Sequence, residues 1–176
     1  RSKGGVAAHG PVPPGVLGTR EGTPEGINKF THTLVNGQPV RRSLDEAKKL
    51  LAEAGYPDGR DVKSGKPLVL NYDYQRTATP EIKAELDWMV KQFAKLGVQL
   101  EIRATDYNQF QDKMLKGKQQ IFWWGWLADY PDAENFLFLL YGPNAKFPTQ
   151  GENAANYSNP EYDRLYRIMQ TLEDGP

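Results

Sequence analysis

The sequence contains no cysteine and only two histidines among its 176 residues. Without cysteine, disulfides, thiolate metal sites and thiol catalysis are all excluded. The two histidines, His9 and His32, are well separated and fall outside every predicted helix and strand, so they do not form a metal-binding motif. We therefore expect neither a metal site nor a cofactor.

An excess of one charge and long apolar runs are also missing. Lys and Arg together number 22, as do Asp and Glu, and the formal net charge is zero. No basic surface is indicated, so nucleic acid is not an expected partner. The longest apolar run, residues 136–141, is far shorter than the roughly 20 residues that span a bilayer.

The two ends of the sequence indicate a piece of a longer protein. The chain starts at Arg1 without an initiator Met, and it stops at Pro176 directly after a strongly amphipathic helix pattern. We expect a domain cut from a larger chain, and no signal peptide is visible in it.

Glycine and proline interrupt residues 1–42, where no helical or strand period is sustained. Because these residues break regular hydrogen bonding, we expect residues 1–42 to form an irregular segment that wraps or links. From Ser43 onward the pattern becomes regular. Residues 43–176 are predicted to form an α/β lobe.

Helices are predicted where apolar residues recur every three or four positions, and strands where they alternate or run continuously. Ser43 with Glu46 forms a capping box, and Thr79 with Pro80 is a typical helix start. The predicted order is helix 44–54, strand 67–72, helix 80–96, strand 98–104, helix 106–116, strand 119–126, helix 132–141 and a last helix from Asn159.

Helices connect the three predicted strands, which favours a mainly parallel sheet in a three-layer α/β lobe. The strand 98–104 has one polar face and is expected at the edge, so the predicted strand order is second, first, third. Ligands of such sheets bind beyond the carboxyl ends of strands where the order reverses, here residues 72–74 and 125–129. Arg76 follows the first of these ends, where it either meets a ligand carboxylate or is a solvated loop residue.

The stretch "IFWWGWLADYPDAENFLFLLYG" places a carboxylate directly after a run of aromatic residues. In one interpretation Asp129 faces a ligand; in the other it is a turn residue satisfied by nearby backbone amides. Asp132 precedes a helix pattern and is expected to be its N-cap. Trp123 and Trp124 alternate across the predicted strand, so one of them is expected in the core.

Several stretches resemble one known family and cover nearly the whole chain in the family's order. They are "GPVPPG", "SLDEAKKLLAEAGYPDG", "FAKLGVQLEIRATDYNQF", "GWLADYPDAENF" and "NYSNPEYD". The chain resembles the C-terminal lobe of the extracytoplasmic solute-binding proteins of peptide ABC importers, the oligopeptide- and dipeptide-binding family. The resemblance implies one lobe of a periplasmic-binding-protein type II-like fold, with the N-terminal lobe absent.

The resemblance also implies roles for residues after the third predicted strand. In the family, an aspartate in a "GW-x-x-D" stretch binds the α-ammonium group of the peptide, and Asp129 occupies that position. The backbone of Gly125 and Leu127 is implied to pair with the peptide main chain by strand addition. The side chains implied to line a pocket for the peptide are those of Trp126, Trp124 and Tyr130.

The function implied by the resemblance is the substrate-binding component of a bacterial ABC importer, located in the periplasm or otherwise outside the cytoplasm. It captures a peptide or similar solute and delivers it to a membrane permease, and it is not an enzyme. The implied partners are the solute, the ABC permease and the N-terminal lobe of the same protein. The residues alone leave two alternatives: a glycoside hydrolase that pairs Asp129 with Asp132 or Glu134, and a protein interaction module that docks through its tryptophans.

Overall fold

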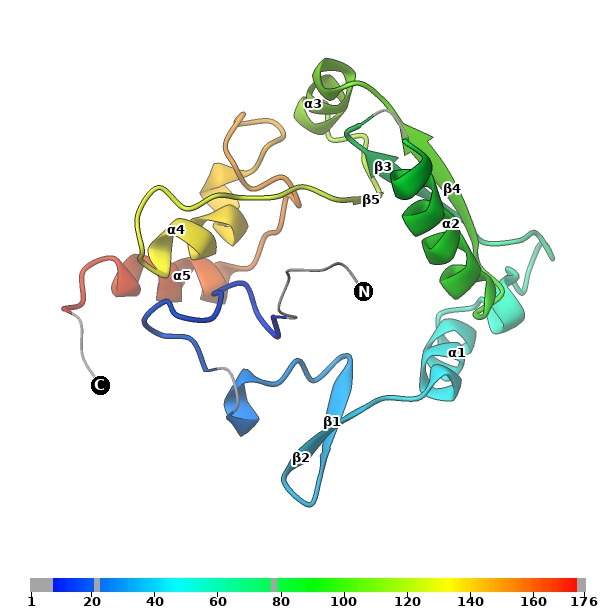
Figure 1. The fold of residues 1–176 in the computed structure, drawn as a ribbon, viewed down its shortest axis with the longest axis horizontal. Coiled ribbons are helices and arrows are strands. Elements are labelled where there is room, and N and C mark those ends of the chain that lie inside the picture. The colour runs from blue at the N-terminus through cyan, green and yellow to red at the C-terminus, as the bar shows by residue number, and fades with distance from the viewer. Residues whose placement is uncertain (1–7, 21–22, 77–78, 174–176) are drawn as a thin grey trace. The chain divides into compact units, whose positions relative to one another are not determined.

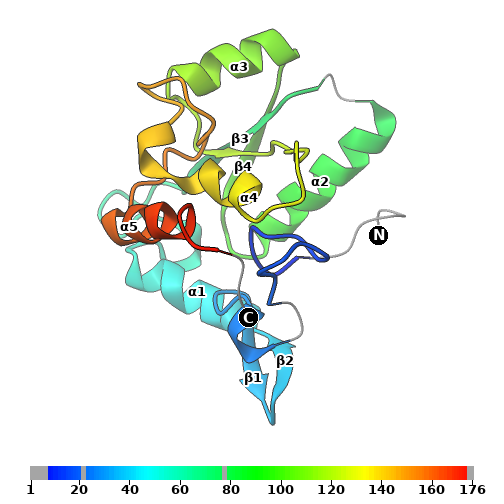
Figure 2. The same ribbon diagram turned by 90° about the vertical axis from the view of Figure 1, so that its left-hand side faces the viewer.

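The computed structural model describes residues 8–20, 23–76 and 79–173. The chain, drawn in Figures 1 and 2, divides into two compact units. The central unit is residues 43–125, and the terminal unit combines residues 1–42 with residues 126–176. The division before Ser43 coincides with the predicted start of the α/β lobe, whereas the division after Gly125 was not predicted. That the whole of 43–176 acts as one lobe stays a prediction.

The central unit contains a three-stranded parallel sheet in the order β4-β3-β5. Its strands are β3 (Val69–Tyr74), β4 (Gln99–Ala104) and β5 (Ile121–Phe122). The predicted order, with strand 98–104 at an edge, is confirmed. The third strand is much shorter than the predicted 119–126: only Ile121 and Phe122 pair with β3, and the Asn71 amide of β3 donates to the side-chain oxygen of Gln120.

Each α-helix of the central unit begins at a side chain that caps it, as predicted. The helices are α1 (Leu44–Glu53), α2 (Pro80–Ala94) and α3 (Tyr107–Leu115). In Ser43, Thr79 and Asp106, a side-chain oxygen accepts a hydrogen bond from the backbone amide three residues later. Each bond satisfies an amide that has no partner within its helix.

α2 and α3 cover opposite faces of the sheet. Tyr72 of β3 packs with Leu86 of α2 and Leu100 of β4 in the buried core. The next residue along β3, Asp73, points to the other face, as strand alternation requires, and forms an ion pair with Lys113 of α3. The central unit therefore has the predicted three-layer architecture.

The ion pair between Asp73 and Lys113 is buried near the carboxyl end of β3. Asp73 is 2% exposed, and the Lys113 side chain is 23% exposed. One carboxylate oxygen of Asp73 accepts a hydrogen bond from Lys113, while the other has no partner among the described residues. Because a buried carboxylate is costly without its cation, this pair fixes α3 against β3.

Residues 1–42 contain a β-hairpin, so the prediction of an irregular segment was wrong for this part. β1 (His32–Val35) and β2 (Gln38–Arg41) pair in antiparallel fashion. Asn36 and Gly37 form the turn with φ of 52° and 76°, and positive φ at both central residues is the requirement of a type I′ turn. The adjacent Asn36 and Gly37 are the sequence signal for this hairpin. Glycine and proline content alone does not reveal it.

Helix α4 (Glu134–Leu137) is shorter than the predicted helix 132–141 and continues as the 3-10 turn η3 (Phe138–Leu140). Its N-cap is Ala133 rather than Asp132, although the Asp132 carboxylate still accepts a hydrogen bond from the Glu134 amide at 2.7 Å. The helix tightens after Leu137, whose carbonyl oxygen accepts a hydrogen bond from the Tyr162 hydroxyl at 2.7 Å. A tertiary contact therefore limits the length of α4.

The last helix, α5 (Pro160–Met169), begins after Asn159 as predicted, and the Asn159 side chain caps it. Before it lies a fully buried asparagine, Asn153. The Asn153 amide group donates to the carbonyl oxygens of Tyr141 and Tyr157, at 3.1 and 2.9 Å, and its oxygen accepts from the Tyr157 amide. These bonds satisfy the buried side chain and hold the approach to α5.

Across the described part of the chain, no helix combines the length and the apolar character needed to cross a membrane.

Candidate ligand-binding loop

The predicted site residues fall on both sides of the boundary between the units. Arg76, Trp124 and Gly125 belong to the central unit, and residues 126–130 belong to the terminal unit. We call residues 126–130 the Asp129 loop. Each group is described within its own unit.

Asn135 of α4 anchors the Asp129 loop. It is only 3% exposed, and its side-chain oxygen accepts two hydrogen bonds, from the indole nitrogen of Trp126 and from the backbone amide of Asp129, both at 3.0 Å. One buried oxygen therefore holds the first residue of the loop and its carboxylate-bearing residue.

Trp126 has a second contact within the terminal unit. Its ring lies edge-on to Phe138 of η3, with the centroids 5.2 Å apart. This edge-to-face arrangement is a favourable one for aromatic pairs. The indole is half-buried, whereas the next side chain, Leu127, is 91% exposed.

Glu134 anchors the other end of the loop. Its carboxylate accepts hydrogen bonds from the hydroxyl groups of Tyr130 and Tyr166. The bond to Glu134 raises the pKa of Tyr130, and a side-chain hydrogen bond with Asn135 acts in the opposite direction. Burial, followed by the bond to Glu134, raises the pKa of Tyr166.

The three carboxylates near the loop differ in what they contact. Asp132 and Glu134 are both engaged inside the unit, by a backbone amide and by tyrosine hydroxyls. Asp129 is exposed, and no hydrogen bond or ion pair from the described residues reaches its carboxylate. A carboxylate with open lone pairs on a held loop is suited to accept charge-assisted hydrogen bonds from a cation.

The two tryptophans after β5 lie against different neighbours in the central unit. Trp124 is edge-on to the fully buried Phe110 of α3, with the centroids 5.2 Å apart. Trp123 stacks on Tyr74 at 6.1 Å and is exposed. Trp124 is thus the member of the pair that packs on the core, and its predicted role in a ligand pocket stays a prediction.

Gly125 and Leu127 lie in extended chain without regular secondary structure. Within the described ranges, their backbone N–H and C=O groups make no hydrogen bond. A Cβ added to Gly125 meets no heavy atom within 4 Å. Unpaired backbone groups in an extended segment are the feature that strand addition uses.

Arg76 is exposed after β3. No hydrogen bond or ion pair joins it to another residue that the structure describes. Its predicted contact with a ligand carboxylate stays a prediction. No group of three or more His, Asp or Glu side chains in the described ranges is arranged to hold a metal ion.

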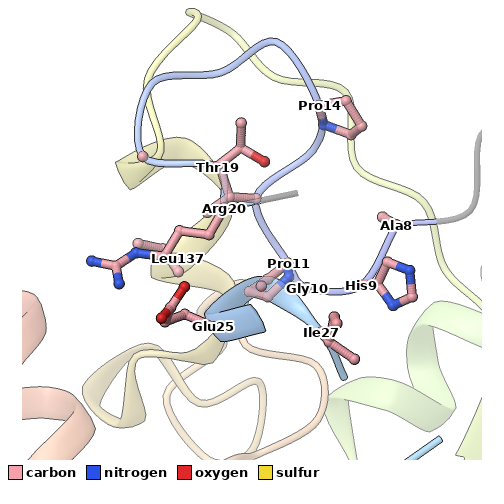
Figure 3. Close-up of a pocket in the computed structure, with 13 residues that line it drawn as sticks. Ala8, His9, Gly10, Pro11, Pro14, Thr19, Arg20, Glu25, Ile27 and Leu137 are labelled. Atoms are coloured by element: carbon pink, nitrogen blue, oxygen red, sulfur yellow. The ribbon is translucent and has the colours of Figure 1, made fainter. Parts of the chain in front are cut away.

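A pocket of about 360 Å³ lies elsewhere in the terminal unit, where the glycine- and proline-rich segment meets α4 (Figure 3). Its wall combines apolar side chains, among them Ile27 and Leu137, with the charged Arg20 and Glu25. None of the predicted ligand-binding residues lines it. No sequence pattern predicted this pocket.

The anchoring of the Asp129 loop by Glu134 and Asn135 of α4 is not predicted from the sequence, where Glu134 is a candidate only for the glycosidase alternative. Their position two and three residues after Asp132, at the start of a helix pattern, indicates a helix start. It does not indicate which loop groups reach them.

Comparison with known proteins places this chain among bacterial binding proteins. A family model described as "Bacterial extracellular solute-binding proteins, family 5 Middle" matches residues 2–148. The "Periplasmic oligopeptide-binding protein OppA" of Escherichia coli is 28% identical over 175 residues, which are 98% of this chain and 27% of the relative. The chain thus spans about a quarter of the length of that relative.

Solved structures share the fold. The OppA structure from Burkholderia pseudomallei aligns with a TM-score of 0.66 and 24% identity, over 97% of this chain and 30% of the other. The periplasmic binding protein DppA from Helicobacter pylori, solved in complex with the peptide STSA, aligns with a TM-score of 0.63 and 21% identity, over 84% and 29%.

Proposed function

We propose a function from one premise, that the chain belongs to family 5 of the bacterial extracellular solute-binding proteins. In this proposal it forms part of one lobe of a receptor that works in the periplasm or otherwise outside the cytoplasm. The receptor captures a peptide or similar solute and delivers it to an ABC permease in the membrane. It binds its solute without changing it chemically.

The observation that carries this proposal is the open carboxylate of Asp129 on an anchored loop. A peptide with a free N-terminus offers an ammonium group, and its bond to a carboxylate is about twice as strong as a neutral hydrogen bond. The unpaired backbone groups of Gly125 and Leu127 add acceptors and donors for a peptide main chain, which is recognition that does not depend on the peptide sequence.

The relatives support a peptide as the ligand. The Escherichia coli relative is named as an oligopeptide-binding protein, and the Helicobacter pylori structure contains a peptide. The glycosidase alternative needs a second carboxylate in a catalytic position. The internal partners of Asp132 and Glu134 argue against it, because both groups are already engaged.

The test is Asp129→Asn in the full-length protein that carries this chain. We expect binding of free-amine peptides to weaken about 10- to 100-fold, the equivalent of a charged hydrogen bond worth about 1.5–3 kcal/mol. N-acetylated peptides lack the ammonium group, so their weaker binding is expected to change little. Isothermal titration calorimetry with paired free and acetylated peptides measures both.

Asp132→Asn is the matched control, because it removes the same charge three residues away. Asn is as good as Asp at helix starts, so the bond to the Glu134 amide is retained. We expect unchanged affinity in this variant. If Asp129→Asn binds free-amine peptides as tightly as the wild type, the role of Asp129 is wrong; if the wild type binds no peptide of a varied library, the peptide class is wrong.

A further inference from the structure

Asn135 joins the parts of the Asp129 loop that have different chemistry. Its one side-chain oxygen contacts the indole nitrogen of Trp126 and the backbone amide of Asp129. Because each nitrogen lies 3.0 Å from that oxygen, the two nitrogens are within about 6 Å of each other. The aromatic ring of Trp126 and the carboxylate-bearing residue Asp129 are thus both hydrogen-bonded to the side-chain oxygen of Asn135.

Asn135, the residue that anchors the loop, is held in place by its surroundings. Asn135 is almost fully buried, and it belongs to α4, which Tyr162 of α5 also contacts through the carbonyl oxygen of Leu137. Glu134 holds Tyr130 at the far end of the loop. Both ends of a five-residue loop are therefore held from adjacent positions of one helix, while the carboxylate between them stays open.

A loop held at both ends lowers the entropic cost of ligand binding. A flexible loop loses conformational entropy when it closes on a ligand, whereas a loop already held in the bound geometry does not. The hydrogen bond at the Asp129 backbone amide fixes the main chain from which the carboxylate projects. Side chains that lock a binding group through a second layer of contacts act in this way in preorganised sites.

We propose that Asn135 is a positioning residue for ligand binding, which holds the main chain that carries the Asp129 carboxylate beside the indole of Trp126 before the ligand arrives. This inference rests on the proposed function. The ligand class it fits is a free-amine peptide whose first residue places an apolar side chain beside its ammonium group.

Ligand-free hydrogen exchange tests the preorganised state without any substitution. In the wild-type protein without peptide, we expect slow exchange of the Asp129 backbone amide and of the Trp126 indole N–H, measured by NMR. Fast exchange of both protons without peptide, with protection gained only on peptide binding, would overturn the proposal.

Substitution tests the consequence for affinity. Asn135→Ala in the full-length protein is expected to weaken binding of a free-amine peptide about tenfold, and to speed exchange of the Asp129 amide. Asn153→Ala is the matched control, because Asn153 is also buried in the terminal unit and its side chain hydrogen-bonds to Tyr141 and Tyr157, which lie outside the Asp129 loop. We expect it to lower thermal stability while leaving peptide affinity unchanged.

Asn135→Asp is the conservative variant, since a carboxyl group keeps an acceptor oxygen in the same place whether ionised or protonated. It is expected to restore slow exchange of the Asp129 amide and most of the affinity. Equal loss of affinity in Asn135→Ala and Asn153→Ala, with Asp129→Asn still impaired, would overturn the positioning role alone. Unimpaired binding by Asp129→Asn would instead overturn the proposed role of Asp129, and the exchange measurement would still test the anchor.

Discussion

At the scale of single residues, Gly125 is a position where the fold does not require glycine but ligand binding favours it. Its φ is not positive, and an added Cβ meets nothing within 4 Å, so neither backbone strain nor packing requires glycine here. A ligand strand that approaches the backbone closely does favour glycine.

We therefore predict that Gly125→Val leaves the melting temperature nearly unchanged and weakens peptide binding about tenfold, about the effect of one lost hydrogen bond of 1.5 kcal/mol. Calorimetric melting and peptide titration of the full-length protein measure the two effects. Gly10 is a control, because an added Cβ there also meets nothing, and Gly10→Val should leave peptide affinity intact. A large drop in melting temperature for Gly125→Val would instead show that the glycine serves the fold.

The sequence allows Asp129 to be picked out as a candidate but does not reveal its anchor. An aspartate after a run of aromatic residues is visible in the printed sequence. The two donors that reach Asn135 are an indole nitrogen and a backbone amide, and only the path of the folded loop brings them together. Buried polar contacts of this kind have no sequence pattern of their own.

At the scale of elements, the turn of the β1–β2 hairpin depends on its two central residues. Asn36 and Gly37 both have positive φ, and a residue other than Gly, Asn or Asp is strained there.

We predict that Gly37→Ala lowers the free energy of unfolding by about 1 kcal/mol, because a Cβ is introduced at a φ of 76°. Urea denaturation measures the change. Asn36→Gly keeps a residue that tolerates positive φ and is expected to be nearly neutral. Equal stability of Gly37→Ala and the wild type would mean that the turn adopts another conformation.

Elements defined by local signals were predicted well, and those defined by tertiary contacts were not. α1, α2 and α3 begin at caps that the sequence displays. The extent of β5 depends on which of its residues pair with β3, and the length of α4 depends on a hydroxyl group from α5. Neither partner is near in sequence, so periodicity overestimated both elements.

At the scale of the whole molecule, the buried Tyr166 and the half-buried Tyr162 make the free energy of unfolding depend on pH in the alkaline range. Burial raises the pKa of Tyr162 from 10.0 to about 12, and burial with the bond to Glu134 also raises the pKa of Tyr166. Below pH 10 both are neutral in the folded and unfolded chain, so their contribution to stability is fully present. Above pH 10 the unfolded tyrosines ionise first, and the contribution is lost as the pH rises through 12.

We therefore predict that the free energy of unfolding falls as the pH rises from 10 to 12, and that Tyr162 ionises above its ordinary range in the folded chain. Ultraviolet absorbance of tyrosinate, recorded with and without urea, measures both. Tyr162→Phe should reduce the pH dependence. Titration of every tyrosine near pH 10 without urea would contradict the prediction.

The strand order and the family were both predictable from the sequence, but the division of the chain was not. The polar face of strand 98–104 identifies it as the edge strand, and several matching stretches identify the family. The boundary after Gly125 falls in an extended stretch without a proline- or serine-rich linker. The amino-acid composition therefore does not indicate this boundary between the units.

The two-residue length of β5 has a consequence for the order of events during folding. β3 pairs with β4 along six residues but with β5 along only two, and β5 is the partner that lies farther along the chain. Distant pairings form late, because closing a long loop comes before any contact that compensates it. The aromatic run that begins at β5 is thus expected to join this sheet last, so that in a newly made chain Trp123, Trp124 and Trp126 reach their native contacts late, at the place where we propose the ligand binds.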